Sequence, residues 1–125
     1  MESKKILLVE DDPFISEMYT TKFEKQGYEC ALAMTGKEGV AKAKEWMPDI
    51  VLLDILIPEM DGFEVLAALK KDTETKKIPV VMLTNLGQKE DIEKGTALGA
   101  AAYIIKAHFT PQEVVDKVKS LLAVG

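Results

Sequence analysis

The sequence predicts an α/β fold: a (βα)5 doubly wound sheet of five parallel strands with helices on both faces. Two observations lead to this prediction. Five short apolar runs alternate with five longer amphipathic segments along the 125 residues, and this alternation is typical of βαβ units. The first, third and fourth runs are also apolar throughout, as expected for parallel strands that are covered on both sides.

Each strand is predicted from one apolar run. The runs are Lys5–Glu10, Tyr28–Met34, Ile50–Asp54, Pro79–Thr84 and Ala101–Lys106. The second run alternates more between apolar and polar residues than the others, which places it near an edge of the sheet. Right-handed crossovers leave few arrangements, of which the flavodoxin-like order 2-1-3-4-5 is the usual one for five strands.

The helices are predicted from amphipathic patterns with start and stop signals. They cover about Pro13–Gln26, Lys37–Trp46, Gly62–Lys71, Lys89–Leu98 and Pro111–Leu122. The pair Asp12-Pro13 is a typical helix start, and Thr110 with Glu113 resembles a capping box. Gly27 follows the first predicted helix, where glycine is favoured.

Length and composition exclude several classes of protein. Residues 1–125 fit a single domain and leave little room for a second. The net charge is −5 and the lysines are scattered, so we expect no binding of nucleic acid by this chain alone. Cys30 is the single cysteine, which rules out an internal disulfide. The first residues resemble neither a signal peptide nor a membrane span, so we expect a soluble cytoplasmic protein.

Polar residues gather at the predicted carboxyl ends of the strands, where sites form in such sheets. These ends carry Glu10-Asp11-Asp12, Asp54, Thr84 followed by Asn85, and Lys106. Taken singly, each has a structural explanation: Asp12 could cap a helix, and Asp54 could form a turn. Because the strand interiors are almost free of polar residues, the joint pattern indicates a functional site.

The chemistry of these residues suggests a metal and a phosphoryl group. Crowded carboxylates repel each other unless a cation offsets their charge. Magnesium prefers oxygen ligands and typically takes one or two carboxylates plus a phosphate oxygen, which suits Asp11, Asp12 and Asp54. An aspartate beside a metal and an ammonium can attack phosphorus, and Lys106 and Thr84 could stabilise the transferring group.

Four motifs together carry a resemblance to a known family. LLVEDD, DIVLLDILIPEMDG, PVVMLT and AAYIIK occur in this order and resemble the receiver domain of two-component response regulators, the CheY-like group. The resemblance covers the chain from Lys4 to about Leu122. It implies magnesium-dependent transfer of a phosphoryl group to Asp54 from a sensor histidine kinase or a histidine phosphotransfer protein.

The resemblance also implies roles for single residues. Asp11, Asp12, Asp54 and the backbone carbonyl of Leu56 would bind Mg²⁺. Lys106 would contact the phosphoryl group, Thr84 would be the switch hydroxyl, and Tyr103 the switch aromatic. Phosphorylation would then change the face made by the fourth helix, fifth strand and fifth helix, which binds a downstream protein target or a second receiver. Such a chain is a signalling receiver that promotes its own phosphorylation and dephosphorylation, not an enzyme.

The sequence departs from the family pattern at two positions. Ala107 follows Lys106 where the family usually has proline, often after a cis bond. A cis bond before a residue other than proline costs about 2.5–4 kcal/mol, so we expect a trans bond with a shifted loop or a strained cis bond. Asn85 follows Thr84 where a small residue is common, and its side chain could hinder access to the pocket or form hydrogen bonds within it.

Other interpretations remain open at this point. One is a receiver-like interaction module that is not phosphorylated. A phosphatase of the haloacid dehalogenase type commonly has a second aspartate two residues after the nucleophile, where this chain has Leu56. A flavin-binding protein would need a phosphate loop rich in glycine and hydroxyl groups after the first strand. The sequence is compatible with a free-standing receiver and with a part of a longer regulator.

Overall fold

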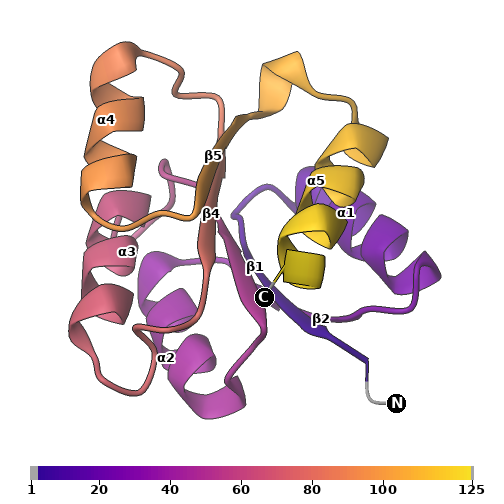
Figure 1. The fold of residues 1–125 in the computed structure, drawn as a ribbon, viewed down its shortest axis with the longest axis horizontal. Helices are drawn as coiled ribbons and strands as arrows, with labels where there is room; N and C mark the ends of the chain where they lie inside the picture. Colours follow the sequence, from indigo (N-terminus) through magenta and orange to yellow (C-terminus); the bar gives the residue numbers. More distant parts are fainter. Residues whose placement is uncertain (1–2, 125) are drawn as a thin grey trace.

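The computed structural model describes residues 3–124 and contains a five-stranded parallel sheet between two layers of helices (Figure 1). The strand order is β2-β1-β3-β4-β5, so the predicted fold class and strand order are confirmed. The elements are β1 (Lys5–Val9), α1 (Pro13–Lys25), β2 (Glu29–Ala33), α2 (Gly36–Trp46), β3 (Ile50–Leu53), α3 (Gly62–Lys71), β4 (Val80–Thr84), α4 (Lys89–Ala97), β5 (Ala102–Ile105), a 3-10 turn η1 (Lys106–His108) and α5 (Pro111–Val124).

Helices α2, α3 and α4 cover one face of the sheet, and α1 and α5 cover the other (Figure 1). Successive residues of a strand point to opposite faces. In β1, Leu7 and Val9 therefore join the core under α2 and α3, whereas Ile6 and Leu8 join the core under α1 and α5. Burial on both faces explains why the central strands are apolar throughout.

Strand β2 lies at one edge of the sheet, as its alternating sequence predicted. Only Ala33 of this strand is fully buried, whereas β3 and β4 are buried over their whole length. Strand β5 forms the opposite edge. The edge strands thus keep the polar or half-exposed residues that the central strands lack.

The predicted helix starts are confirmed by their hydrogen bonds. Oδ1 of Asp12 accepts from the backbone N–H of Phe14 and Ile15 at 2.9 and 3.2 Å. Thr110 and Glu113 form a reciprocal capping box at the start of α5, with bonds of 2.8 and 3.1 Å. Both caps satisfy backbone donors that have no partner within the helix.

The loop after β3 returns to the strand end because Gly62 has no side chain. A Cβ atom at this position would lie 2.4 Å from the carbonyl oxygen of Asp54. The N–H of Gly62 also donates to the carbonyl of Ile55 at 2.9 Å. The glycine of the Met-Asp-Gly sequence therefore lets the start of α3 pack directly against the backbone that carries Asp54.

The opposite end of the sheet is held by different contacts. The ammonium of Lys5, at the start of β1, lies 5.2 Å from the ring centre of Trp46, and its backbone N–H donates to Oδ2 of Asp49 at 2.7 Å. Trp46 is thus at the amino ends of the strands, far from the polar residues at their carboxyl ends. Among the helices of residues 3–124, none is long and apolar enough to cross a membrane.

Candidate functional site

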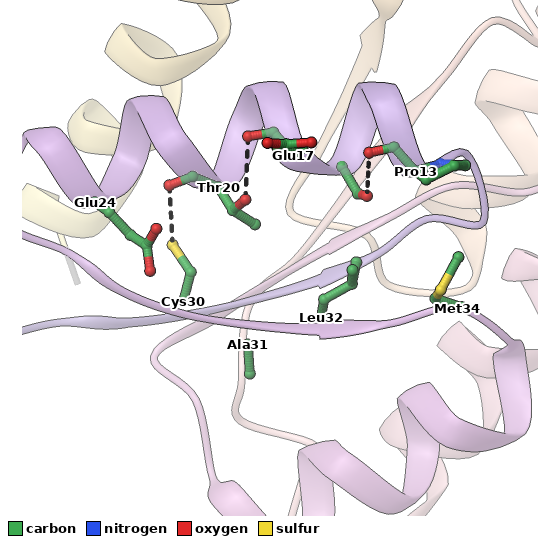
Figure 2. A pocket seen from close by; sticks show the side chains of 9 residues that line it. Pro13, Glu17, Thr20, Glu24, Cys30, Ala31, Leu32 and Met34 are labelled. Carbon is green, nitrogen blue, oxygen red and sulfur yellow. Dashed lines mark hydrogen bonds between the residues drawn. The ribbon is translucent and has the colours of Figure 1, made fainter.

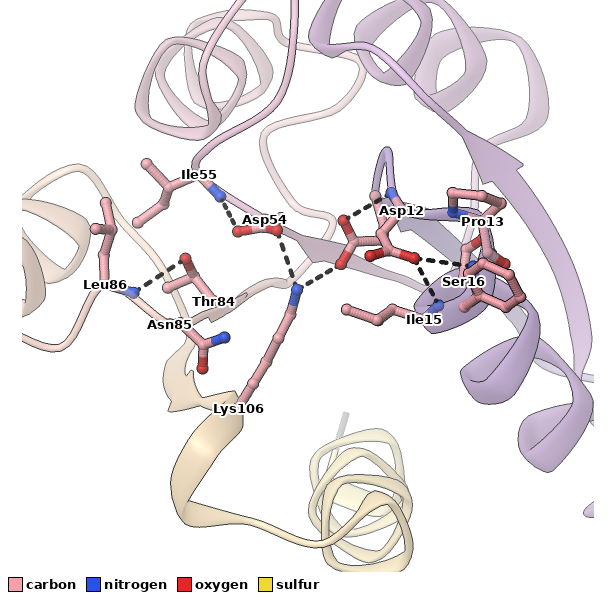
Figure 3. A network of polar contacts seen from close by, with 12 residues as sticks. Asp12, Pro13, Ile15, Ser16, Asp54, Ile55, Thr84, Asn85, Leu86 and Lys106 are labelled. Carbon is pink, nitrogen blue, oxygen red and sulfur yellow. Dashed lines mark hydrogen bonds and ion pairs between the residues drawn. The ribbon is translucent and has the colours of Figure 1, made fainter.

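The polar residues that were singled out in the sequence meet at the carboxyl ends of the strands (Figure 3). Glu10, Asp54 and Lys106 are each the first residue after β1, β3 and β5, and Thr84 is the last residue of β4. Since β1, β3, β4 and β5 are successive neighbours in the sheet, the topology brings these four side chains to one edge.

Lys106 lies between two carboxylates. Its ammonium nitrogen is 3.0 Å from Oδ2 of Asp54 and also donates to Oε1 of Glu10. The second oxygens accept from the backbone, since Oδ1 of Asp54 is 2.7 Å from the N–H nitrogen of Ile55 and Oε2 of Glu10 is 3.2 Å from that of Asp12. Every carboxylate oxygen of the pair therefore accepts a hydrogen bond, which fixes both acids in place.

Burial and charge shift the pKa values of this cluster. Glu10 is 2% exposed; its burial and the nearby charge of Asp54 raise the pKa of its carboxyl, although Lys106 opposes the shift. Burial alone would lower the pKa of Lys106, but its hydrogen bond to Glu10 and the charge of Asp54 outweigh this effect, so the pKa is raised. The lysine is therefore held in its charged form.

Three carboxylates are close enough to share a cation. Glu10, Asp11 and Asp54 each offer an oxygen within 4.8 Å of the others, and such hard oxygen donors suit a divalent ion such as magnesium. Asp12 is not in this group, and Oδ1 of its carboxylate caps α1. The geometry therefore groups Glu10 with Asp11 and Asp54, and the expected role of Asp12 as a metal ligand stays a prediction.

Leu56 has a side chain that is 66% exposed in the loop after β3. This exposure gives the side chain no role in the core. The expected contribution of Leu56, its backbone carbonyl, stays a prediction.

Thr84 and Tyr103 both contact the backbone of Leu86. The hydroxyl oxygen of Thr84, a residue only 1% exposed, accepts from the N–H of Leu86 at 3.3 Å. The hydroxyl of Tyr103 donates to the carbonyl of Leu86. Burial, followed by the charges of Asp91 and Asp54, raises the pKa of Tyr103 to about 12, so the phenol stays protonated and able to donate.

The turn after Lys106 is trans. No peptide bond within residues 3–124 is cis, so of the two expected forms the chain adopts the unstrained one. The N–H of Ala107 donates to Oδ1 of Asn85 at 3.0 Å. Sequence reasoning singled out these two positions separately as departures, but it missed that they contact each other. His108, also in the turn, is exposed.

Apolar side chains surround the site on the side of α1. Phe14 is 84% exposed, and Met18 and Phe109 are also exposed. A hollow of about 260 Å³ lies between the start of α1 and the turn after β5, and Met18, Lys106 and Phe109 line it. An exposed apolar surface next to a polar site is typical of protein interaction.

A second hollow, between α1 and the edge strand β2, lies outside the strand-end cluster (Figure 2). Cys30 faces it, with its sulfur 4.0 Å from the carbonyl oxygen of Thr20. Burial and the charge of Glu24 raise the pKa of this thiol to about 12. The cysteine is therefore a protonated, half-buried side chain.

The fold and the cluster together define a class: doubly wound α/β domains with an acid-lined carboxyl edge, a central aspartate, a hydroxyl and a lysine. The family model for the response regulator receiver domain matches residues 6–119, and the chain belongs to this family. It is a signalling domain.

Similar proteins agree with this assignment. RpaA of Synechocystis sp., a DNA-binding dual master transcriptional regulator, is 40% identical over 118 residues, which are 94% of this chain and 48% of that protein. PhoB of Pseudomonas aeruginosa, a phosphate regulon transcriptional regulatory protein, is 38% identical over 98% of this chain and 53% of its own length. The chain thus spans about half the length of the curated relatives it matches.

Solved structures of similar proteins have the same fold over their full length. A putative response regulator from Chloroflexus aurantiacus has a TM-score of 0.89 and 33% identity, covering 98% of this chain and 99% of that one. The chemotaxis protein CheY4 of Vibrio cholerae has a TM-score of 0.87 and 30% identity, covering 94% of this chain and 98% of its own.

Proposed function

We propose that this chain is the phosphoacceptor of a two-component phosphorelay and that Asp54 receives the phosphoryl group. The observation that carries the proposal is the position of Asp54, with Lys106 at 3.0 Å from its Oδ2 and the carboxylates of Glu10 and Asp11 beside it. An ammonium and an acidic cluster around one aspartate suit a reaction in which charge develops on phosphoryl oxygens.

The transfer forms one bond and breaks another. An oxygen of the Asp54 carboxylate attacks the phosphorus of a phosphohistidine on the partner protein, the P–N bond breaks, and the imidazole leaves with its electron pair and takes up a proton. The product is an acyl phosphate on Asp54. Lys106 then moves its contact from the carboxylate to a phosphoryl oxygen, and water later hydrolyses the acyl phosphate.

Asp11 and Asp54 are the residues that would hold Mg²⁺, with Glu10 next to them and the carbonyl of Leu56 as a further ligand. The bound ion would supply positive charge for the phosphoryl oxygens. Glu10 already accepts hydrogen bonds at both oxygens, so its part is to hold Lys106 in place and to add negative charge near the ion. Asp12 caps α1 through Oδ1 and would contribute to the ion only through its other carboxylate oxygen.

Leu86 would transmit the conformational change from the phosphorylated site to the face formed by α4, β5 and α5. The hydroxyl oxygen of Thr84 accepts from Leu86, and its proton would be donated to a phosphoryl oxygen. Turning the hydroxyl toward Asp54 would strain that contact and the bond between Leu86 and Tyr103. The face formed by α4, β5 and α5 would then change shape and bind a downstream protein target or a second receiver.

The partner that donates the phosphoryl group is a sensor histidine kinase or a histidine phosphotransfer protein. Phe14, Met18 and Phe109 offer it an apolar surface beside the site. Neither the fold nor the site depends on a reducing compartment. The single cysteine and a histidine kinase partner nevertheless fit the expected cytoplasmic location.

The proposal is tested by the intact mass of the protein after incubation with acetyl phosphate or phosphoramidate, with and without Mg²⁺. We expect one phosphoryl adduct that requires Mg²⁺ and is removed by hydroxylamine. Mass is the better readout because Trp46 lies at the opposite end of the sheet and its fluorescence need not report on the site.

Two variants serve as test and control. Asp54→Asn should give no adduct, whereas Asp49→Asn, at the opposite end of β3, should be phosphorylated like the wild type. The absence of an adduct with both donors and with a histidine kinase would contradict the proposal and favour an interaction module that is not phosphorylated.

A further inference from the structure

The two loops that flank the site are joined by a side chain. Asn85 directly follows Thr84, and Ala107 directly follows Lys106. The N–H of Ala107 donates to Oδ1 of Asn85 at 3.0 Å. The bond therefore connects the residue next to the hydroxyl with the residue next to the ammonium, across two neighbouring strands.

The start of the turn after β5 lacks a cap of its own. Lys106 begins the 3-10 turn η1, and the preceding residue, Ile105, provides no side-chain cap. The first N–H groups of a helical turn have no partner within it, so Asn85 supplies from the neighbouring loop the acceptor that the turn itself lacks. The backbone from which the Lys106 side chain extends is held by this bond.

The rest of the Asn85–Gly87 segment lies along β5. Leu86 accepts from the hydroxyl of Tyr103, and a Cβ atom at Gly87 would lie 2.9 Å from a side-chain carbon of Ile105. Asn85 contacts Ala107, the residue directly after Lys106. A proline at position 107 would have no N–H to donate. The bond therefore requires both the acceptor of Asn85 and a residue other than proline at position 107.

We propose that Asn85 is a positioning residue, whose bond to Ala107 holds Lys106 with its ammonium against Asp54. The proposal rests on the proposed phosphoacceptor function. Asn85 touches no reacting atom; it acts through the backbone of the turn. The competing explanation is that Asn85 merely narrows the access to the pocket, and this predicts the opposite result when the side chain is shortened.

Two substitutions separate positioning from access. Asn85→Leu keeps the size of the side chain and removes the acceptor, whereas Asn85→Ala removes both. If Asn85 positions Lys106, both variants should be phosphorylated by acetyl phosphate about three- to tenfold more slowly at saturating donor. The donor concentration for half the maximal rate should stay unchanged. A faster Asn85→Ala with an unchanged Asn85→Leu would establish access and overturn the proposal.

Nuclear magnetic resonance gives a readout that does not depend on phosphorylation. In Asn85→Leu the amide proton of Ala107 should exchange faster, and the ammonium signal of Lys106 should broaden or disappear. Asn85→Asp, which keeps an acceptor oxygen, should preserve both signals. If the wild type gives no adduct, the proposed phosphoacceptor function fails, but the Lys106 signal still tests whether Asn85 positions Lys106. An unchanged Lys106 signal in Asn85→Leu would overturn the positioning role of Asn85.

Discussion

Lys106 neutralises Glu10, a carboxylate that is almost completely removed from solvent. The two residues are far apart in the sequence and meet only because β1 and β5 run parallel with their carboxyl ends at the same edge. Removing a carboxylate from water is costly unless a partner compensates its charge. Lys106, which also contacts Asp54, therefore contributes to the stability of the fold.

Lys106→Met should destabilise the protein in metal-free buffer by about 3 kcal/mol near neutral pH, because Glu10 is left charged, buried and next to Asp54. The loss should shrink as the pH falls and Glu10 takes up a proton. Burial raises the pKa of Glu10, so its contribution to folding is favourable at low pH and is lost as the pH rises through the folded-state pKa. Urea unfolding at several pH values measures both effects.

The double variant Lys106→Met with Glu10→Gln is the control for this prediction. An amide carries no charge, so most of the lost stability and the added pH dependence should disappear together. If the double variant were as unstable as the single one, the loss would come from packing of the lysine stem and not from the unpaired carboxylate.

Asp11 and Asp12 should separate metal binding from helix capping. Asp11→Ala should weaken Mg²⁺ binding at least about tenfold with little change in stability, because this carboxylate is exposed and belongs to the acidic cluster. Asp12→Ala should keep most of the Mg²⁺ affinity but lower the free energy of unfolding by about 1 kcal/mol, because α1 loses its cap. Calorimetric titration and urea unfolding of both variants measure the two effects. An equal loss of Mg²⁺ affinity in both variants would show that Asp12 is also a metal ligand.

The sequence predicts most of the site because strand ends are easy to recognise. Continuous apolar runs that stop at Asp54, Thr84 and Lys106 place these residues correctly at one edge. The sequence does not show which acid after β1 turns toward the pocket. A signal was available, however: Asp12 was recognised as a helix cap, and a carboxylate that bonds to backbone N–H groups is less free to bind a metal.

The bond between Asn85 and Ala107 lies beyond what sequence patterns reveal. The residues are 22 positions apart, and neither belongs to a periodic segment. Their contact depends on the register of β4 and β5 and on the trans turn that follows Lys106. Local propensity accounts for helices and strands, whereas contacts between loops depend on how the finished sheet places its ends.

Tyr103→Phe should lower the free energy of unfolding by about 1 kcal/mol through loss of the bond to Leu86. The substitution should also remove a pH dependence of the free energy of unfolding in the alkaline range. Because the pKa of Tyr103 is raised to about 12, its contribution is present below the ordinary tyrosine pKa near 10 and is lost as the pH rises toward 12. Ultraviolet titration of phenolate should show one late-ionising tyrosine fewer in the variant. If the phenol missing from the variant were instead one that ionises near pH 10, Tyr103 would be exposed in solution.

Cys30 should react slowly with iodoacetamide while the protein is folded. The thiolate is the reactive form, and burial together with Glu24 raises the pKa of Cys30 to about 12, so little thiolate is present near pH 8. We expect alkylation at least about tenfold slower than in the urea-unfolded chain, followed by mass spectrometry. Glu24→Gln, which removes the nearby charge but leaves Cys30 covered, should speed the reaction only slightly, because burial is the larger cause. A folded protein that reacts as fast as the unfolded one would show that the hollow between α1 and β2 opens readily and that β2 is a mobile edge.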